Sequence, residues 1–192
     1  CGSPFFVPGM LARAIDEVNE LEPDVVVVSG DLTGEGFLGE YEQAKEYLDR
    51  FECPNVVVIP GNHDSRNVGY LHFEDLNNGR VGRGRYEWIR EQFRYPADLR
   101  VFVLHHHLLP IPGTGRERSV VFDAGDVLEV LMEANVDLVL SGHKHVPYAW
   151  QLERLFVVNA GTVSTTRLRG RVKPCYNIIE VTPDLVTIDQ KF

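Results

Sequence analysis

Four short apolar runs, each followed by polar residues able to bind a metal, constrain the fold of this chain more than any other feature. The runs are rich in β-branched or aromatic residues and cover 25–28, 56–59, 101–104 and 137–140. Segments with a helical spacing of apolar residues separate them. This alternation predicts an α/β fold. The continuous valine runs at 25–28 and 56–59 are typical of strands that a parallel sheet buries on both faces.

The rest of the chain supports one domain spanning residues 1–192. Helical periodicity covers 7–21, 40–51, 86–93 and 126–134, while the Gly- and Pro-rich stretches 65–85 and 110–119 predict loops. Four strand-like segments follow residue 147, at 148–152, 155–158, 175–181 and 185–189. We therefore expect an α/β sheet core that a second, hairpin-like sheet closes.

Metal-competent side chains come directly after each of the four apolar runs. They are Asp31; Asn62 with His63 and Asp64; His105, His106 and His107; and His143 with His145. Ligands of open α/β sheets bind at the carboxyl ends of the strands. We therefore expect these four segments to converge on one edge of the sheet.

Each segment alone has a simpler interpretation. Asp31 fits a helix cap, Asn62 fits a turn, and a single histidine at a strand end is usually structural. Gly30, Gly61 and Gly142 precede the polar groups and are compatible with simple turns as well as with close approach of the backbone to a ligand. The coincidence of all four segments at strand ends favours one shared site.

The types of side chain restrict the metal. Carboxylate, amide oxygen and imidazole, without thiolate, form a mixed set that suits Mn, Fe, Zn or Co. A carboxylate such as Asp31 is able to bridge two cations, and two cations roughly 3.5–4 Å apart bind and activate a phosphate ester.

The charge of the chain argues against a general nucleic-acid surface. The formal net charge is −9, and no long block of Lys or Arg occurs. Two local basic clusters have two interpretations each, a solvated loop or a rim that steers phosphate. They comprise Arg80, Arg83 and Arg85, and then Arg167, Arg169, Arg171 and Lys173.

Cysteine usage and hydropathy bear on the compartment. The three cysteines are widely spaced and form no Cys-x-x-Cys pair. A reducing, cytoplasmic setting is the simplest expectation. No apolar run approaches the roughly 20 residues that span a membrane, so we expect no membrane partner.

The polar segments together resemble the calcineurin-like metallophosphoesterase family. The matching motifs are Gly30-Asp31, Gly61-Asn62-His63-Asp64, the histidine triplet and Gly142-His143-Lys144-His145. The segment from Gly61 to Arg66 and the histidines after the third run look most like the branch with class III cyclic-nucleotide phosphodiesterases. The resemblance implies an α/β/β/α sandwich of two sheets and a centre with two divalent transition-metal ions.

The resemblance also implies a role for each matching residue. Asp31 would bridge both metals, His145 would bind the first, and Asn62, His143 and one triplet histidine would bind the second. Related sequences place the triplet ligand two residues before a proline, whose position Leu108 takes here; this favours His106 and leaves His105 as a rival. His63 would protonate the leaving group or orient the phosphate, with Asp64 supporting it.

One motif of the family is not found in this sequence. The family's Asp-x-His, which supplies two ligands of the first metal, does not occur before Asp31. The residues from Gly2 to Phe6 look like those that normally follow that motif. We therefore expect the first strand to lie upstream of residue 1.

The expected activity is hydrolysis of a small phosphorylated substrate, a phosphodiester rather than a monoester. A nuclease of the same family is an alternative that the acidic balance disfavours. A non-catalytic interaction protein with the same fold is another, which the retained Asn62, His63 and His143 disfavour. Arg66 is equally compatible with a phosphate contact and with a solvent-facing loop, and homo-oligomerisation stays open.

Overall fold

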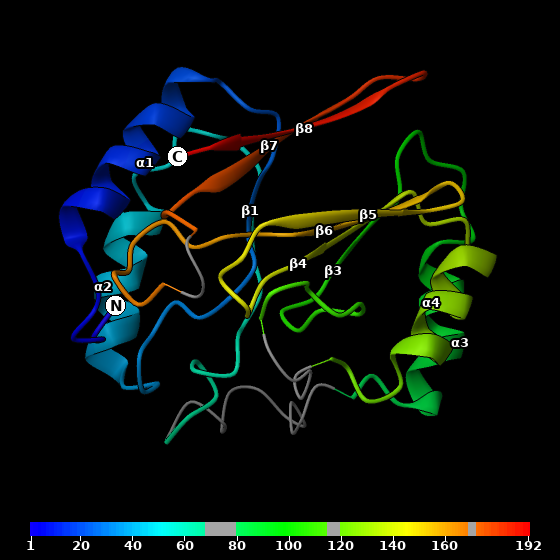
Figure 1. The fold of residues 1–192 in the computed structure, drawn as a ribbon, viewed down its shortest axis with the longest axis horizontal. Coiled ribbons are helices and arrows are strands. Elements are labelled where there is room, and N and C mark those ends of the chain that lie inside the picture. Colours follow the sequence, from blue (N-terminus) through cyan, green and yellow to red (C-terminus); the bar gives the residue numbers. More distant parts are fainter. Residues whose placement is uncertain (68–79, 115–119, 169–171) are drawn as a thin grey trace.

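Helices and strands alternate up to residue 141 and are followed by strands alone, as the sequence predicts. The computed structural model describes residues 1–67, 80–114, 120–168 and 172–192 (Figure 1). Its elements are α1 (Pro8–Glu20), β1 (Val26–Val28), α2 (Leu38–Leu48), β2 (Val56–Val58), α3 (Arg83–Gln92), β3 (Val101–Val103), α4 (Ala124–Glu133), β4 (Leu138–Ser141), β5 (Tyr148–Leu152), β6 (Leu155–Asn159), β7 (Tyr176–Val181) and β8 (Val186–Lys191).

The largest sheet has the order β3-β4-β6-β5 and carries the main core. β3, β4 and β6 are parallel, and β5 returns antiparallel to β6. Val139 and Val157 of this sheet belong to one buried apolar cluster with Val127 and Leu131 of α4 and Ile89 of α3. Figure 1 shows α3 and α4 together at one end of the sheet.

Asp123, which precedes α4, anchors the segment that leads into α3. Its carboxylate accepts hydrogen bonds from the amides of Val81 and Gly82 and from the hydroxyl of Tyr86. These bonds hold the pKa of Asp123 below its usual value, although burial alone would raise it. Burial and the bond to Asp123 raise the pKa of Tyr86 to about 12. α3 consequently begins at Arg83, three residues before the helix that the sequence predicts.

The valine strands β1 and β2 form a separate parallel pair. Val25 is 50% exposed and Val57 is 42% exposed. The prediction that these runs are buried on both faces is therefore wrong for the described chain. The reason is that the main apolar cluster of the described residues lies on the larger sheet and includes no residue of β1 or β2.

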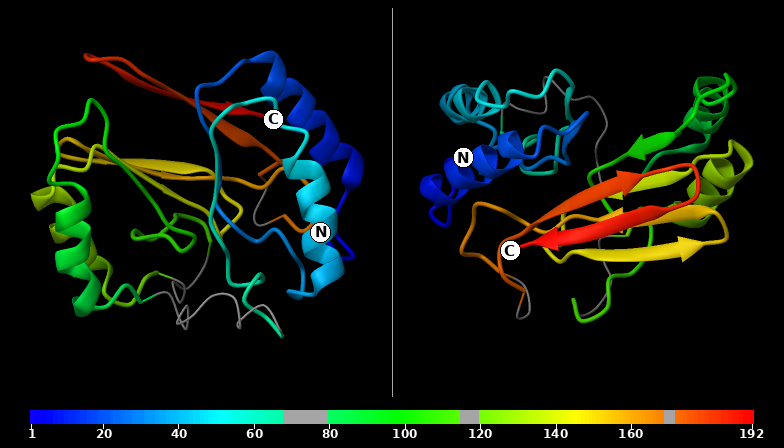
Figure 2. Two further views of the ribbon diagram at one scale, coloured as in Figure 1. Left: turned by 180° about the vertical axis from the view of Figure 1, so that it is seen from behind. Right: turned by 90° about the horizontal axis from the view of Figure 1, so that it is seen from above.

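The last two strands form an antiparallel hairpin, β7–β8. Figures 1 and 2 show this hairpin above the larger sheet. The side-chain amide of Asn177 donates to the carbonyl of Asn159 at the end of β6, over 3.3 Å. The described strands thus form three hydrogen-bonded groups, where the resemblance implies two sheets. No helix in the described ranges is long and apolar enough to cross a membrane.

Candidate metal centre

The loops after β1, β2, β3 and β4 meet, as the sequence predicts. The Ile59 amide donates to the Val28 carbonyl, which joins the ends of β1 and β2. The Gly142 amide donates to the His105 carbonyl, which joins the loops after β3 and β4. His105 Nδ1 lies 2.7 Å from the Ser29 carbonyl and so connects these two groups of strands. Residues more than 100 positions apart therefore share one site.

Glycine is required where two of these loops touch. A Cβ atom on Gly61 would lie 2.2 Å from Asp31 Oδ1 and 2.4 Å from the Asp31 amide nitrogen. Gly30 has a φ of +96°, and a Cβ there would lie 2.6 Å from the Gly61 nitrogen. Because both distances are far inside van der Waals contact, only glycine allows the loops after β1 and β2 to pack this closely.

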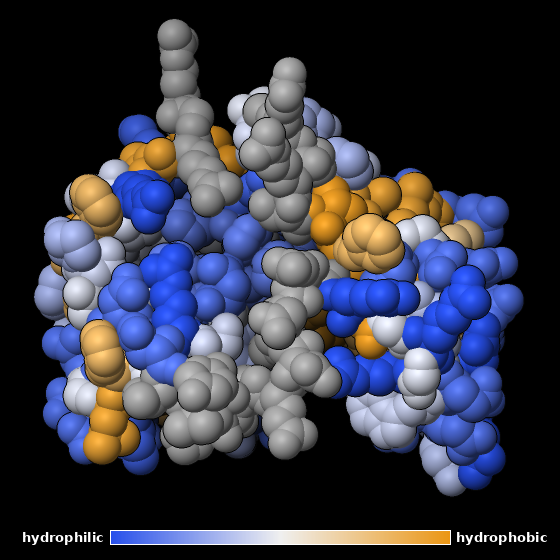
Figure 3. Space-filling model, turned by 90° about the horizontal axis from the view of Figure 1, so that it is seen from below, coloured by the Kyte–Doolittle hydropathy of each residue, from blue (hydrophilic) through white to orange (hydrophobic). Residues whose placement is uncertain are grey.

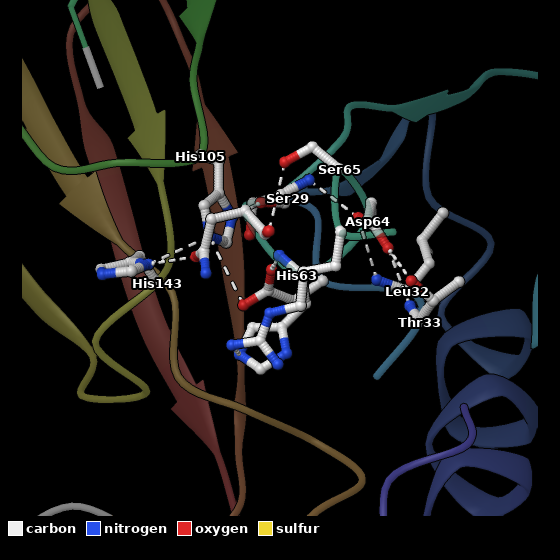
Figure 4. A network of polar contacts seen from close by, with 12 residues as sticks. Ser29, Leu32, Thr33, His63, Asp64, Ser65, His105 and His143 are labelled. Atoms are coloured by element: carbon white, nitrogen blue, oxygen red, sulfur yellow. Dashed lines mark hydrogen bonds and ion pairs between the residues drawn. The ribbon is translucent and has the colours of Figure 1, made fainter. Parts of the chain in front are cut away.

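Four polar side chains converge at the centre of the site. Asn62 Oδ1 lies 2.8 Å from His143 Nδ1 and 3.1 Å from His105 Nε2. His105 Nε2 is also 3.4 Å from Asp31 Oδ2. One ligand atom from each of Asp31, His105 and His143 lies within 4.8 Å of the others, which is close enough for one ion to contact all three. Figure 4 shows His105 and His143 approaching from the larger sheet, with His63 opposite.

The hydrogen bonding of His105 indicates which of its nitrogens faces this centre. The Ser29 carbonyl is only an acceptor, so Nδ1 carries the proton that it receives. In the neutral ring, Nε2 is then an acceptor that faces two oxygen acceptors, Asn62 Oδ1 and Asp31 Oδ2, and the ring nitrogen His143 Nδ1 at 3.2 Å. Acceptors that face one another in this way repel unless a cation or a proton lies between them. This arrangement, with an outer carbonyl fixing the histidine tautomer, fits a bound metal ion.

The triplet places His105, rather than His106, within this cluster of ligand atoms. The His106 ring lies beside the cluster, with its centroid 4.4 Å from that of His143. Burial and the neighbouring histidines lower the pKa of His106 to about 4, so the ring is neutral at pH 7. His107 is buried, and its ring stacks on His143 at 6.1 Å between centroids. The geometry therefore favours His105 as the triplet ligand, whereas the family resemblance favours His106.

His63 lies at the edge of the site and is held by backbone groups. Its amide donates to Asp31 Oδ1, and its Nδ1 lies 2.8 Å from the Gly34 carbonyl. This bond directs the other ring nitrogen, Nε2, to a position 3.4 Å from the guanidinium of Arg66. Arg66 itself pairs with Glu35 at 2.8 Å. His63 and Arg66 therefore form a connected pair on one wall.

Asp64 connects loops and does not face the metal-competent cluster. Its fully buried carboxylate accepts hydrogen bonds from the amides of Gly61, Leu32 and Thr33 and from the Thr33 hydroxyl. Figure 4 shows the carboxylate directed toward Leu32 and Thr33. The structure thus gives Asp64 the role of holding the loops after β1 and β2 together, and its support of His63 is through the backbone.

Three of the candidate ligands have left-handed backbone conformations. The φ angles are +59° for Asp31, +69° for His143 and +58° for His145. Such a conformation costs roughly 1 kcal/mol or more for a residue with a side chain, and it concentrates at functional sites. His145 Nδ1 lies 3.3 Å from the Arg167 carbonyl, which directs its Nε2 in the same way as the carbonyls beside His63 and His105.

The site opens into a polar cleft of about 200 Å³. The cleft is lined by Asp31, Asn62, His63, Arg66, His143, His145 and Arg167. Every lining residue is polar or charged, and two of them are arginines. In the view from below, hydrophilic side chains predominate on the side of α1 and α2, whereas the side of α3 and α4 shows a hydrophobic group at the top and hydrophilic side chains beneath it (Figure 3). The cleft is therefore chemically suited to a small anion.

The two basic clusters have different surroundings. Arg167 belongs to the cleft, whereas Arg169 and Arg171 lie outside the described residues. Arg80 lies over the ring of Phe122, 5.6 Å from its centroid. Arg83 and Arg85 are exposed in the first turn of α3. The cleft thus draws on the second cluster through Arg167.

Sequence comparison identifies the family. The sequence model of the calcineurin-like phosphoesterases matches residues 8–147, well over half of the chain. This chain therefore belongs to the calcineurin-like phosphoesterase family, and the resemblance read from its motifs is confirmed.

Curated relatives include proteins named as phosphodiesterases. A probable cyclic nucleotide phosphodiesterase from Synechococcus is 24% identical over 160 residues, which cover 70% of this chain and 62% of that protein. The DNA double-strand break repair protein Mre11 of Haloferax volcanii is 30% identical, over 80% of this chain and 33% of that protein. The chain thus spans less than two thirds of either relative.

Solved structures agree on the fold. A purple acid phosphatase from yellow lupin superimposes with a TM-score of 0.65 and 15% identity, over 91% of this chain and 44% of that protein. Zinc-bound Vps29 from Entamoeba histolytica superimposes with a TM-score of 0.56 and 15% identity, over 98% and 91%. At such identities the likeness establishes the metallophosphoesterase-type α/β fold and no activity.

Proposed function

We propose that this chain hydrolyses a phosphate ester, preferentially a phosphodiester, at a centre of two divalent metal ions. The observation that carries the proposal is the convergence of Asp31, Asn62, His105 and His143, with facing acceptor atoms, on one cleft. The metals, when bound, would polarise the phosphate and lower the pKa of a bound water. Membership of the family supports the same chemistry.

The side chains divide between the two metals as follows. Asp31 would contribute to both, and Asn62, His105 and His143 would hold the second. We assign His105 here in place of His106 because its Nε2 lies 3.1 Å from Asn62 Oδ1. His145, whose ring is oriented by the Arg167 carbonyl, contributes to the first metal. The mixed oxygen and nitrogen set suits Mn, Fe, Zn or Co.

His63 is the proposed proton donor to the leaving group. Its ring lines the cleft, and the Gly34 carbonyl accepts the proton of Nδ1, so the ring must carry a second proton, on Nε2, to act as the donor. Arg66 lies 3.4 Å from Nε2 and positions the ring. Asp64 contributes by fixing the loop that carries His63.

Replacing Asp31 with Asn tests the proposal. Asn tolerates the left-handed conformation of residue 31, so the loop is retained while the charge that joins two cations is lost. With Mn²⁺ and bis(p-nitrophenyl) phosphate, we expect the full-length wild-type protein to be active and Asp31→Asn to lose activity about 100-fold or more. Metal content, measured by elemental analysis, should fall in parallel.

The matched control is Asp98→Asn, an exposed acidic residue before β3. It makes the same change of charge and should leave both activity and metal content unchanged. Full activity of Asp31→Asn would overturn the two-metal assignment.

A paired substitution separates the two histidines. His105→Gln removes the ring whose Nε2 faces Asn62 and Asp31, and we expect metal affinity to fall about 10- to 100-fold. His106→Gln removes a neighbouring ring of the same size and should have a much smaller effect. The reverse order of effects would return the ligand role to His106.

The two alternatives make different demands. An interaction protein without metals would bind no transition metal at Asp31 and His105. Metal found by the same elemental analysis would exclude this alternative, and absence of metal would support it. A nuclease would bind DNA with an affinity that falls steeply with salt, which the net charge of −9 disfavours.

A further inference from the structure

We propose that Arg167 is the side chain that binds the substrate's phosphate oxygens, with Phe5 as its support. The proposal rests on the proposed function, because it concerns the substrate of the same cleft. It names a residue that lies 22 positions beyond His145, outside every motif that brought the metal-competent residues together. Two arginines line the cleft, Arg66 and Arg167, and they differ in their contacts.

Arg66 is already neutralised by the protein. Its guanidinium pairs with Glu35 at 2.8 Å and donates to the Gly34 carbonyl at 3.3 Å. These contacts occupy both N–H donors of Nη1, and the Glu35 carboxylate offsets the charge of the guanidinium. Arg66 is therefore suited to orient His63, which it also contacts, and less suited to attract an anion.

Arg167 has no ion pair with a carboxylate among the described residues. It lines the cleft, and its guanidinium lies over the ring of Phe5, 5.9 Å from the centroid. An aromatic face attracts a cation without occupying its in-plane hydrogen-bond donors. The fork of donors is thus available to two oxygens of a phosphate, the geometry that a guanidinium favours.

The contact between Arg167 and Phe5 is built by the backbone. The Val7 amide donates to the Ser164 carbonyl at 2.7 Å, and the Thr166 amide donates to the Phe5 carbonyl at 3.0 Å. Phe6 forms a β-bridge with Thr165 between these two bonds. These two hydrogen bonds make up the bridge, and they hold the backbone of Arg167 beside the segment that carries Phe5.

The main chain of Arg167 contacts His145, which is a candidate metal ligand. The Arg167 carbonyl lies 3.3 Å from His145 Nδ1 and so orients that imidazole. Substitution of the side chain leaves this carbonyl in place. The contribution of the guanidinium is therefore separable from the orientation of His145.

Arg167→Ala is the decisive variant, measured in the full chain. We expect the Kd for inorganic phosphate, from isothermal titration calorimetry, to rise about tenfold. The KM for bis(p-nitrophenyl) phosphate should rise by a similar factor, while kcat changes about twofold or less, because the guanidinium binds the phosphate without taking part in bond cleavage. Arg167→Lys should bind phosphate more tightly than Arg167→Ala but less tightly than the wild type. Lysine keeps the positive charge but lacks the paired N–H donors of the guanidinium.

Phe5→Leu tests the support. It keeps an apolar side chain and removes the aromatic face, so we expect the Kd for phosphate to rise about two- to threefold. Arg154→Ala is the control for charge: this arginine is exposed in the turn between β5 and β6, at the end of the sheet away from the cleft. It should leave the Kd and the KM unchanged.

Two results would overturn the proposal. One is phosphate binding by Arg167→Ala that equals binding by Arg154→Ala. The other is a loss of kcat with an unchanged KM. Arg167→Gln provides a second neutral variant should the alanine variant unfold, and melting curves identify that case. Phosphate binding is measured without turnover, so failure here is distinct from failure of Asp31→Asn to abolish hydrolysis.

Discussion

Two regions of the molecule bury their side chains in different places. The first region is residues 1–67, and the second region is the described part of residues 80–168. Between residues 80 and 168, the described residues include an apolar cluster that joins β4 and β6 to α3 and α4. In residues 1–67 the buried apolar side chains are Ile15 and Ala44 alone. Burial there is concentrated instead in the loops, at Thr33, Gly61 and Asp64.

This difference teaches that the two parts of the site have different kinds of support. His105 and His143 extend from strands that a packed core holds. Asp31 and Asn62 extend from the pair β1–β2, whose loops are held by the Asp64 carboxylate and by the contact between Gly30 and Gly61. Polar contacts at the site therefore replace apolar packing in the first region.

Gly61→Ala should produce the largest effect and break the support of the first region. The new methyl group would overlap both the carboxylate and the backbone of Asp31. We expect the free energy of unfolding to fall by about 3 kcal/mol. Urea denaturation measures this change, and metal content should fall with it. The control is Gly125→Ala in α4, where a Cβ meets no atom within 4 Å; equal stability of the two variants would contradict the close contact.

Val139→Ala tests the packed region. Val139 is fully buried in β4, so its truncation leaves a cavity. We expect a loss of about 2 kcal/mol in the free energy of unfolding, with the metal-binding residues themselves unchanged. A loss below about 0.5 kcal/mol in urea denaturation would show that the cluster is less tightly packed than described.

Val57→Ala is the matched change in the first region and should have a smaller effect. The side chain is 42% exposed in β2, so truncation removes little buried area. We expect a loss below about 1 kcal/mol by the same measurement. A loss equal to that of Val139→Ala would remove the contrast between the regions.

The smallest effect concerns pH and Tyr86 in the second region. Its pKa is raised from the ordinary value of 10.0 to about 12. A raised pKa in the folded state means that the stabilisation is complete below about pH 10 and is lost as the pH rises toward 12. Tyr86→Phe should therefore show a smaller decrease in Tm between these pH values than the wild-type chain. An identical decrease would indicate that Tyr86 ionises equally in both states.

Much of the fold was predictable because periodicity is local. The positions of the helices and strands follow from apolar spacing, and the strand ends identify the segments that meet. Burial of β1 and β2 was not predictable, because a valine run is the same whether or not another layer covers it. The exposure of Val57 depends on which parts of the chain pack against that face of the strand pair.

The finer geometry of the site depends on contacts that spacing does not encode. The Ser29 carbonyl selects the tautomer of His105, and this contact joins residues 76 positions apart. The preference for His106 came from its spacing to the position of the family's proline. That spacing does not report the contact with the Ser29 carbonyl, which orients the His105 ring. The role of Asp64 in holding two loops together also depends on four distant donors. Arg167 was visible in the sequence only as part of a basic cluster.

The β-bridge between Phe6 and Thr165 also has a consequence for the order of folding. It closes a loop of nearly the entire chain, and such contacts carry a high entropic cost before any compensating interaction forms. The core of β4, β6, α3 and α4 involves shorter separations along the sequence. We therefore expect the cleft to be completed late, after the core has formed, so that only a nearly folded chain acquires its capacity to retain an anion.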